Sequence, residues 1–276
     1  MRSTPRSSDK LAAELAAMGA SFRVGLDAAV AAWPVLLGRA IFYGVCMLVL
    51  TAFWDKVGAQ RLAGGFAMRL PPGGLAVYVG VTEWVTLSVP AIQLRLEDDI
   101  RSGALEAQLL RPKAYLAQAI AGQAGGMAAR LAMLGVAALG LLALSGRAWP
   151  PAAAIAEAAV LGVIGAVIGV LVYALVGLTA FWLRRVLPVL LIVQKLMFLL
   201  GGLFAPIALY PPWLHAIAAA SPFGAHLAFA GQAVIGLTAG ELCGALALQG
   251  FWLAALSAAA WLVWRAGLAR ALRQGI

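Results

Sequence analysis

Six long apolar stretches dominate the sequence, and they limit the chain to an integral membrane protein. We expect membrane spans at Val35–Trp54, Gly73–Gln93, Ala114–Leu144, Ile155–Leu183, Leu187–Leu209 and Cys243–Trp264. A helix needs about 20 apolar residues to cross a bilayer, so each stretch is long enough. Only 11% of the residues are charged, against about 25% in soluble proteins. The composition excludes a soluble enzyme and predicts an all-α integral membrane protein with a single transmembrane domain over residues 1–276.

An amphipathic helix is expected ahead of the first span. Its apolar side chains recur every three or four residues, the spacing of one helix face: Leu11, Leu15, Met18, Phe22, Leu26, Val30 and Trp33. Glu14, Arg23 and Asp27 fall off this face. Such a helix lies in the membrane interface, and Pro34 marks its end. Residues 1–34 are thus expected to be a cytoplasmic tail and an interfacial helix.

The segment before the last span is expected to lie on the external side. Residues 210–242 are too apolar for a solvated loop, but Pro211, Pro212 and Pro222 interrupt them. Because proline lacks a backbone donor and ends helices, no full span fits here. We expect short helices that dip back into the outer leaflet, where protein covers the backbone polar groups. This segment is predicted to be an external re-entrant segment.

Basic residues gather on one side of the predicted spans. With the N-terminus inside, fourteen of the 20 Lys and Arg residues fall on the cytoplasmic side, four fall outside and two lie within spans. Loops rich in Lys and Arg stay in the cytoplasm, so both termini are expected there. The net charge of +9 has this origin rather than nucleic-acid binding. The Ala- and Gly-rich composition, without sorting signals, favours a bacterial inner membrane.

One cytoplasmic connection is longer and more charged than the others. Residues 94–113 read LRLEDDIRSGALEAQLLRPK, and they hold four of the chain's 11 acidic residues. We expect Glu97, Asp98 and Asp99 to precede a helix start, where negative charge is favourable. A short amphipathic helix with charged ends would dock a soluble partner. The alternative is a solvated connector.

This loop carries a resemblance to a known family. Asp98-Asp99-Ile100-Arg101-Ser102-Gly103 and Leu109-Leu110-Arg111-Pro112 resemble the intracellular-loop signature of the ABC-2 family of transporter membrane subunits. The resemblance extends over nearly the whole chain, including the amphipathic first helix, the six spans and the external segment. It implies a membrane subunit that pairs with a second one, identical or paralogous. It also implies docking on a separate ATP-binding-cassette subunit through a coupling helix at residues 94–113.

The resemblance places ATP and Mg²⁺ on that partner, with no cofactor bound by this chain. The sequence contains no G-x-x-x-x-G-K-[ST] motif and no Gly-Lys dipeptide, so it lacks the usual phosphate cradle. The residues expected to couple to the ATPase are Glu97, Asp98, Asp99, Ile100, Arg101, Gly103, Leu109, Leu110, Arg111 and Pro112. Ile100, Leu109 and Leu110 would be anchors in a groove of the partner. Asp98, Arg101 and Arg111 would supply charges at its rim.

Three charged residues are expected inside spans. Glu83 lies near the middle of the second span, where an acid costs roughly 3 kcal/mol on insertion scales. It either pairs with Arg130 or Lys195, contacts a cationic substrate, or takes part in proton coupling. Glycines of the third and fourth spans let helices approach closely, within one subunit or at a dimer seam: Gly122, Gly125, Gly126, Gly162, Gly165 and Gly169.

Neither metal binding nor catalysis is expected. Cys46 and Cys243 are far apart, and His215 and His226 lack flanking acids, so no metal-binding spacing exists. The leading hypothesis is an exporter subunit for a small compound, cationic or lipophilic. A stand-alone secondary transporter driven by protons or sodium is the alternative. Inverted repeats would be expected for many such folds, and residues 35–144 and 155–264 show no convincing match. A membrane scaffold without transport is a third class.

Overall fold

The computed structural model describes residues 7–57, 74–105, 115–183, 185–203 and 205–273, and these form helices and connections without a strand. The α-helices are α1 Ser7–Ala31, α2 Trp33–Val57, α4 Gly74–Ser88, α5 Ile92–Arg101, α7 Tyr115–Leu144, α8 Ala152–Leu178, α9 Leu187–Leu200, α10 Pro212–Ala220, α11 Pro222–Ala233 and α12 Ala239–Arg273. Two short 3-10 helices, η1 Thr179–Phe181 and η2 Ile207–Leu209, complete the set. The predicted all-α fold is confirmed for these residues.

Five helical segments of the described chain are long and apolar enough to cross a membrane. They are Trp33–Trp54, Gly74–Arg101, Tyr115–Leu144, Ala152–Phe181 and Ala239–Arg273. They correspond to the first four predicted spans and the last one. The second is a 28-residue segment that is broken at Pro90 into α4 and α5. The multi-pass membrane architecture follows from these helices.

The predicted fifth span, Leu187–Leu209, differs from the structure. Helix α9 has only 14 residues and ends at Leu200, so it is about 21 Å long, short of the roughly 30 Å hydrocarbon core. Gly202 then takes a positive φ of 67°, a conformation that glycine adopts without a Cβ clash and that ends the helix. The predicted count of six spans is therefore not confirmed.

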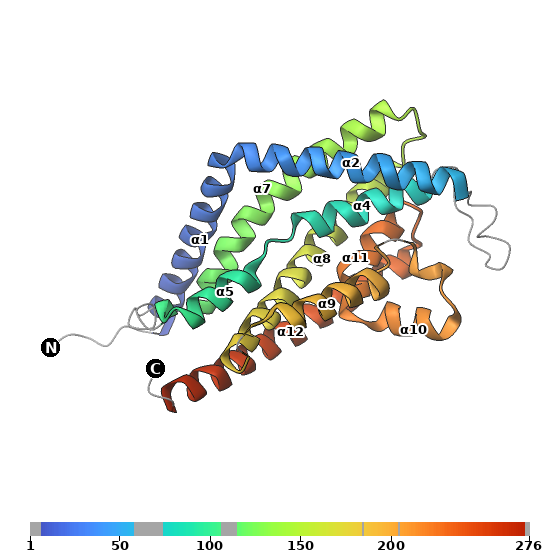
Figure 1. Cartoon of the computed structure of the whole chain (residues 1–276). Helices are drawn as coiled ribbons and strands as arrows, with labels where there is room; N and C mark the ends of the chain where they lie inside the picture. Colours follow the sequence, from blue (N-terminus) through green and yellow to red (C-terminus); the bar gives the residue numbers. More distant parts are fainter. Residues whose placement is uncertain (1–6, 58–73, 106–114, 184, 204, 274–276) are drawn as a thin grey trace.

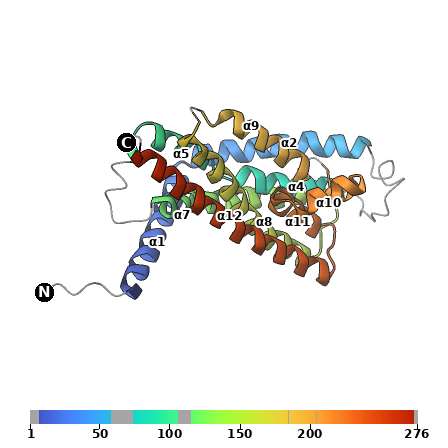
Figure 2. The ribbon, with the colours of Figure 1, turned by 90° about the horizontal axis from the view of Figure 1, so that it is seen from below.

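The helices run between two ends of the molecule. Helix α1 begins, and α5 and α12 end, at one end, which we call the α5 end; α10 lies at the opposite end, the α10 end (Figure 1). Helix α1 meets α2 at a sharp angle near Trp33 and lies across the α5 end (Figures 1 and 2). Helix α7 crosses the molecule obliquely, so its first half lies beside α1.

Glycines allow α1 and α7 to touch through their backbones. A Cβ on Gly25 would overlap the carbonyl oxygen of Gly122, and one on Gly125 would overlap that of Phe22. The glycines of α7 thus pack against another helix of the same subunit, one of the two expected uses. The opposite face of α1 leaves Leu15 and Val30 more than half exposed.

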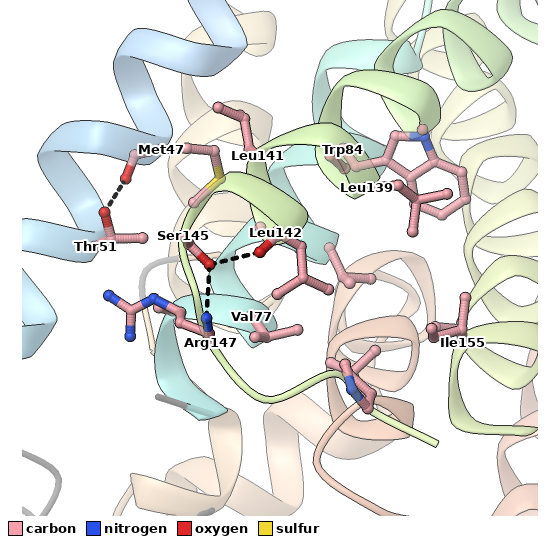
Figure 3. Close-up of a pocket in the computed structure, with 18 of the residues that line it drawn as sticks. Met47, Thr51, Val77, Trp84, Leu139, Leu141, Leu142, Ser145, Arg147 and Ile155 are labelled. Atoms are coloured by element: carbon pink, nitrogen blue, oxygen red, sulfur yellow. Dashed lines mark hydrogen bonds between the residues drawn. The ribbon is translucent and has the colours of Figure 1, made fainter. Parts of the chain in front are cut away.

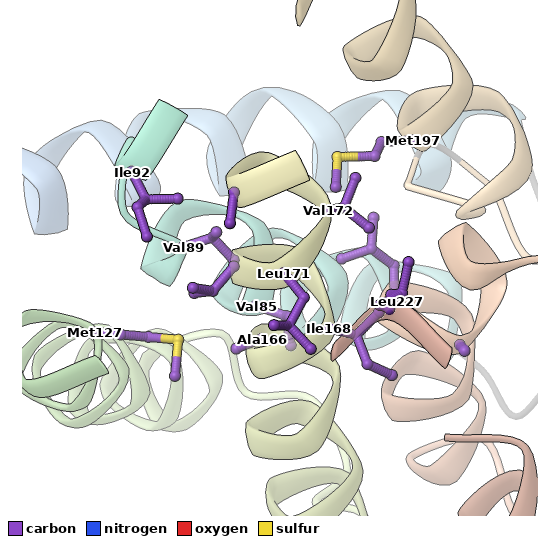
Figure 4. Close-up of a cluster of buried hydrophobic side chains, with 14 of the residues drawn as sticks. Val85, Val89, Ile92, Met127, Ala166, Ile168, Leu171, Val172, Met197 and Leu227 are labelled. Carbon is purple, nitrogen blue, oxygen red and sulfur yellow. The ribbon is translucent and has the colours of Figure 1, made fainter. Parts of the chain in front are cut away.

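Helix α8 lies at the centre of the core. Its Gly162 packs against Trp84 and its Gly169 against His226, while a Cβ on Gly165 would overlap the His226 carbonyl oxygen. These glycines admit α4 and α11 to close contact. Side chains of α4, α5, α7, α9 and α11 fill the space around them, among them Val85, Ile92, Met127, Met197 and Leu227 (Figure 4).

Polar side chains inside the bundle hold helices through backbone carbonyls. Gln249 of α12 donates to the carbonyl oxygens of Leu161 and Ala225, both at 2.9 Å. Tyr78 of α4 donates to the carbonyl of Gly202 at 2.8 Å. In lipid no water replaces such partners, so each bond fixes the relative position of two or three segments.

The segment predicted as external forms two short helices. Ser221 separates α10 from α11, and its hydroxyl accepts the Gly224 amide at 3.0 Å as a helix N-cap. Helix α11 is buried along most of its length, including Ala225 and Leu227. The expected short helices are present, and protein covers one of them. Their depth in a bilayer stays a prediction.

The close contact at Gly165 predicts a strong effect of a single methyl group. Gly165→Ala forces α8 away from α11, and we expect a loss of about 1–3 kcal/mol of stability, as for other overpacked cores. A lower melting temperature of the detergent-purified protein is the readout. Gly140→Ala is the matched control, because a Cβ there meets no atom within 4 Å. Equal melting temperatures of the two variants would contradict the packing.

Candidate functional site

Helix α5 carries the predicted partner-facing residues to the α5 end. Pro90 breaks the helix after Ser88, and α5 resumes the same direction from Ile92 to Arg101 (Figure 1). Its inner face is anchored, since Ile92 and Leu96 are fully buried. Gly177 of α8 lies so close that a Cβ there would come within 2.8 Å of the Gln93 Cα. The base of the predicted coupling loop is therefore fixed to α8.

The acidic residues occupy a different part of the helix from the one predicted. Glu97, Asp98 and Asp99 were expected to precede a helix start, but they lie in the second half of α5. The reason is that the helix begins directly after the proline break rather than after the acids. Arg101 in the last turn has the favourable charge for that helix end.

The ion pairs between charged residues of α5 are long. Arg95 lies 3.7 Å from Asp99, and Arg101 lies 3.7 Å from Glu97, each one turn apart. In each pair the arginine is exposed and the acid is mostly buried, and 3.7 Å is too long for a hydrogen bond between them. Asp98 is exposed and makes no ion pair with any described residue. The charges of Arg95, Asp98 and Arg101 are thus accessible to another molecule. Glu97 and Asp99 are mostly covered by their own chain.

Two contacts fix the orientation of this end. The Tyr115 hydroxyl of α7 donates to the Asp99 carboxylate, and the Tyr115 ring stacks on Trp264 of α12 at 5.3 Å between centroids. Ile100 packs, partly buried, against Val186 and other residues where α8 is followed by α9. Ile100 thus contacts its own chain, and its role in a partner groove stays a prediction.

The chain turns directly after α5. The Ser102 hydroxyl donates to the Asp98 carbonyl at 2.7 Å, and Gly103 takes a φ of 75°. A residue with a Cβ would be strained at this φ, so the turn itself explains why glycine occupies position 103. The remaining predicted coupling residues, Leu109, Leu110, Arg111 and Pro112, lie outside the described residues.

The three charged residues predicted inside spans are not brought together. Glu83 is half-buried on α4 and lies near Tyr43 and Cys46 of α2, close enough for electrostatic interaction. Arg130 lies on α7 beside α1, and Lys195 is exposed on α9. None of the three pairs with another among the described residues. Sequence spacing could not reveal this, because each residue belongs to a different helix.

The structure contains an apolar pocket near the α10 end that no sequence pattern indicated. Helices α2, α4, α7 and α8 enclose a cavity of about 210 Å³, which we call the apolar pocket (Figure 3). Trp84 forms one wall and is held by a 2.8 Å hydrogen bond from its indole nitrogen to the Leu131 carbonyl. Thr51, Ser145 and Arg147 supply the polar rim. Such a pocket accepts a small apolar group.

No group of three metal-binding side chains exists among the described residues, and Cys46 and Cys243 are free thiols. The arrangement provides a charged surface at one end and an apolar pocket at the other.

The apolar pocket predicts selective labelling by a lipophilic photoprobe. A diazirine-bearing hydrocarbon should label peptides around Trp84 and Leu142, and Ala138→Phe should reduce that labelling several-fold by filling the pocket. Mass spectrometry of the purified protein measures the modified peptides. Ala143→Phe is the control, since Ala143 is exposed on the same helix and does not line the pocket. Unchanged labelling of the Ala138 variant would contradict a ligand-accessible pocket.

Comparison with known proteins agrees with this arrangement. A family model described as ABC-2 family transporter protein matches residues 75–275, which is more than half of the chain. Searches of curated proteins and of solved structures return no significant match. The matched region contains α5, the apolar pocket's walls from α4, α7 and α8, and the short helices α10 and α11. The chain belongs to the ABC-2 family of transporter proteins.

Proposed function

We propose that this chain is the membrane-spanning subunit of an ATP-driven exporter that moves a small lipophilic or cationic compound out of the cell. It pairs with a second membrane subunit, identical or paralogous, in the bacterial inner membrane. Separate ATP-binding-cassette subunits bind ATP and Mg²⁺. The family match carries this proposal, together with a sequence that has no phosphate-binding motif of its own.

The α5 end is the docking surface for the ATPase in this proposal. Its support is the exposed charge of two residues on the firmly anchored helix α5: Asp98, which has no ion pair among the described residues, and Arg101. Leu109 and Leu110 are the apolar anchors, and Arg111 is a rim charge. A charged rim around an apolar centre is the usual anatomy of a specific protein interface.

Helix α8 is the element that transmits movement. It touches Gln93 and Leu96 of α5 through Gly177, and its other end lines the apolar pocket through Ile155 and Ala158. Its 27 residues form one helix, about 40 Å long. When the closing ATPase displaces α5, α8 moves with it as one rigid helix and shifts the wall of the apolar pocket that it forms.

The substrate class rests on two features. The apolar pocket suits a lipophilic compound. Glu83 is half-buried without an ion-pair partner among the described residues, which suits a cation. Both lie along α4, so one compound with an apolar body and a positive charge satisfies both.

Replacing Leu109 and Leu110 with Asp should uncouple ATP hydrolysis from transport. Two buried carboxylates would remove the apolar anchors, so substrate-stimulated ATPase activity and export should fall at least about tenfold. The measurement uses the complex purified from its host through a tag on this chain. Ala271→Asp with Leu272→Asp is the control, which adds the same charge near the end of α12.

Membrane insertion of the Leu109/Leu110 variant should be unchanged. Unaltered export by that variant would contradict the proposed coupling role of Leu109 and Leu110. Transport by the purified chain alone, driven by an ion gradient, would favour a secondary transporter instead.

The proposed orientation predicts one-sided labelling of two new cysteines. In a chain with Cys46 and Cys243 replaced by Ala, Ser145→Cys at the α10 end should react with a membrane-impermeant maleimide in intact cells. Ser102→Cys at the α5 end should react only after permeabilisation (Figure 1). The basic-residue asymmetry is the physical reason. The reverse pattern would place the α5 end outside the cell, where a cytoplasmic ATPase could not bind it.

A further inference from the structure

A second cavity, larger than the apolar pocket, lies between α1, α5 and α7. Its volume is about 760 Å³, and we call it the arginine cavity. One face of α1, including Ser21 and Val24, forms one wall. Arg95 of α5 and Arg130 of α7 reach it from the other side. No part of the proposed export mechanism uses this cavity.

Positive charge in the arginine cavity exceeds what the described residues neutralise. The Arg130 Nη1 atom is buried and has no hydrogen-bond partner, and Arg39 lies close enough to repel Arg130. Arg95 meets Asp99 only at 3.7 Å, and half of its side chain is exposed. The Asp99 carboxylate already accepts a hydrogen bond from Tyr115. A buried guanidinium nitrogen without a hydrogen-bond partner is costly, and an anion in the cavity would remove that cost.

The arginine cavity opens toward the surface that faces lipid. Val24 lines it and is 69% exposed, and Ala20 and Ala28, which line it on the same face of α1, are also exposed. Exposed apolar side chains on a helix at the membrane interface contact acyl chains. A molecule that enters from this side thus has an apolar part along α1 and an anionic part at the arginines.

We propose that the arginine cavity binds the phosphate-bearing headgroup of an anionic membrane phospholipid. The Arg95 and Arg130 guanidinium groups hydrogen-bond the phosphate oxygens, an arrangement for which the planar guanidinium is well suited. The acyl chains lie against the exposed Ala20, Val24 and Ala28 beside the cavity. The inference rests on the proposed function only for the placement of the α5 end in the inner leaflet, not for the ATPase or the substrate.

Lipid titration of the purified full-length chain, followed by native mass spectrometry, tests this proposal. Wild-type protein should retain phosphatidylglycerol at least about tenfold more tightly than phosphatidylcholine. Arg95→Gln with Arg130→Gln should abolish that difference. Arg23→Gln should leave it within about twofold, because Arg23 is exposed on α1 and does not line the cavity.

A second variant tests the same site independently, in case the arginine double variant misfolds. Ala28→Phe introduces bulk at an exposed lining position without a change of charge, and it should also weaken phosphatidylglycerol retention. Retention unaffected by Ala28→Phe and by the arginine changes would overturn the proposal. Displacement of the lipid by millimolar inorganic phosphate would assign the site to a free anion and overturn it too. Because no ATPase is present, these results do not depend on the export mechanism.

Discussion

Backbone contact at glycines is the constraint on which the rest of the structure depends. Lipid tails are as apolar as leucine side chains, so burial alone does not hold helices together in a membrane. Close packing and hydrogen bonds to carbonyls replace it. Gly165 admits the α11 backbone to α8, and Gly125 admits α1 to α7. Gln249 then ties α12 to both α8 and α11 through two carbonyls.

These contacts decide where the functional surfaces lie. Gly177 fixes α5 against the end of α8. The charged residues that follow Leu96 on α5 therefore have a fixed position relative to α8. The α1 and α7 contact has a second consequence. Because the helices touch near Gly25 and Gly125, space remains beside them, where Arg95 and Arg130 line the arginine cavity. Gly25 and Gly122, which bring the two helices together, also line this cavity.

Apolar length and charge predicted the helical membrane fold, because both are local properties of the sequence. The same reasoning failed at α9, where Gly202 ends the helix within an apolar stretch that is long enough to span. It also misplaced the acids of α5, since the helix start is set by Pro90. The separation of Glu83 from Arg130 and Lys195, and both cavities, depend on which helices are neighbours. Single-sequence patterns do not contain that information.

The central helix α8 combines the close packing of the core with the proposed transmission of movement. A glycine inside a helix costs about 1 kcal/mol relative to alanine, and α8 carries Gly162, Gly165, Gly169 and Gly177. Their contacts with α4, α11 and α5 offset this cost. A helix held on several sides moves as a unit with its neighbours rather than sliding alone. In the proposed mechanism, a push at α5 would therefore displace the walls of the apolar pocket together.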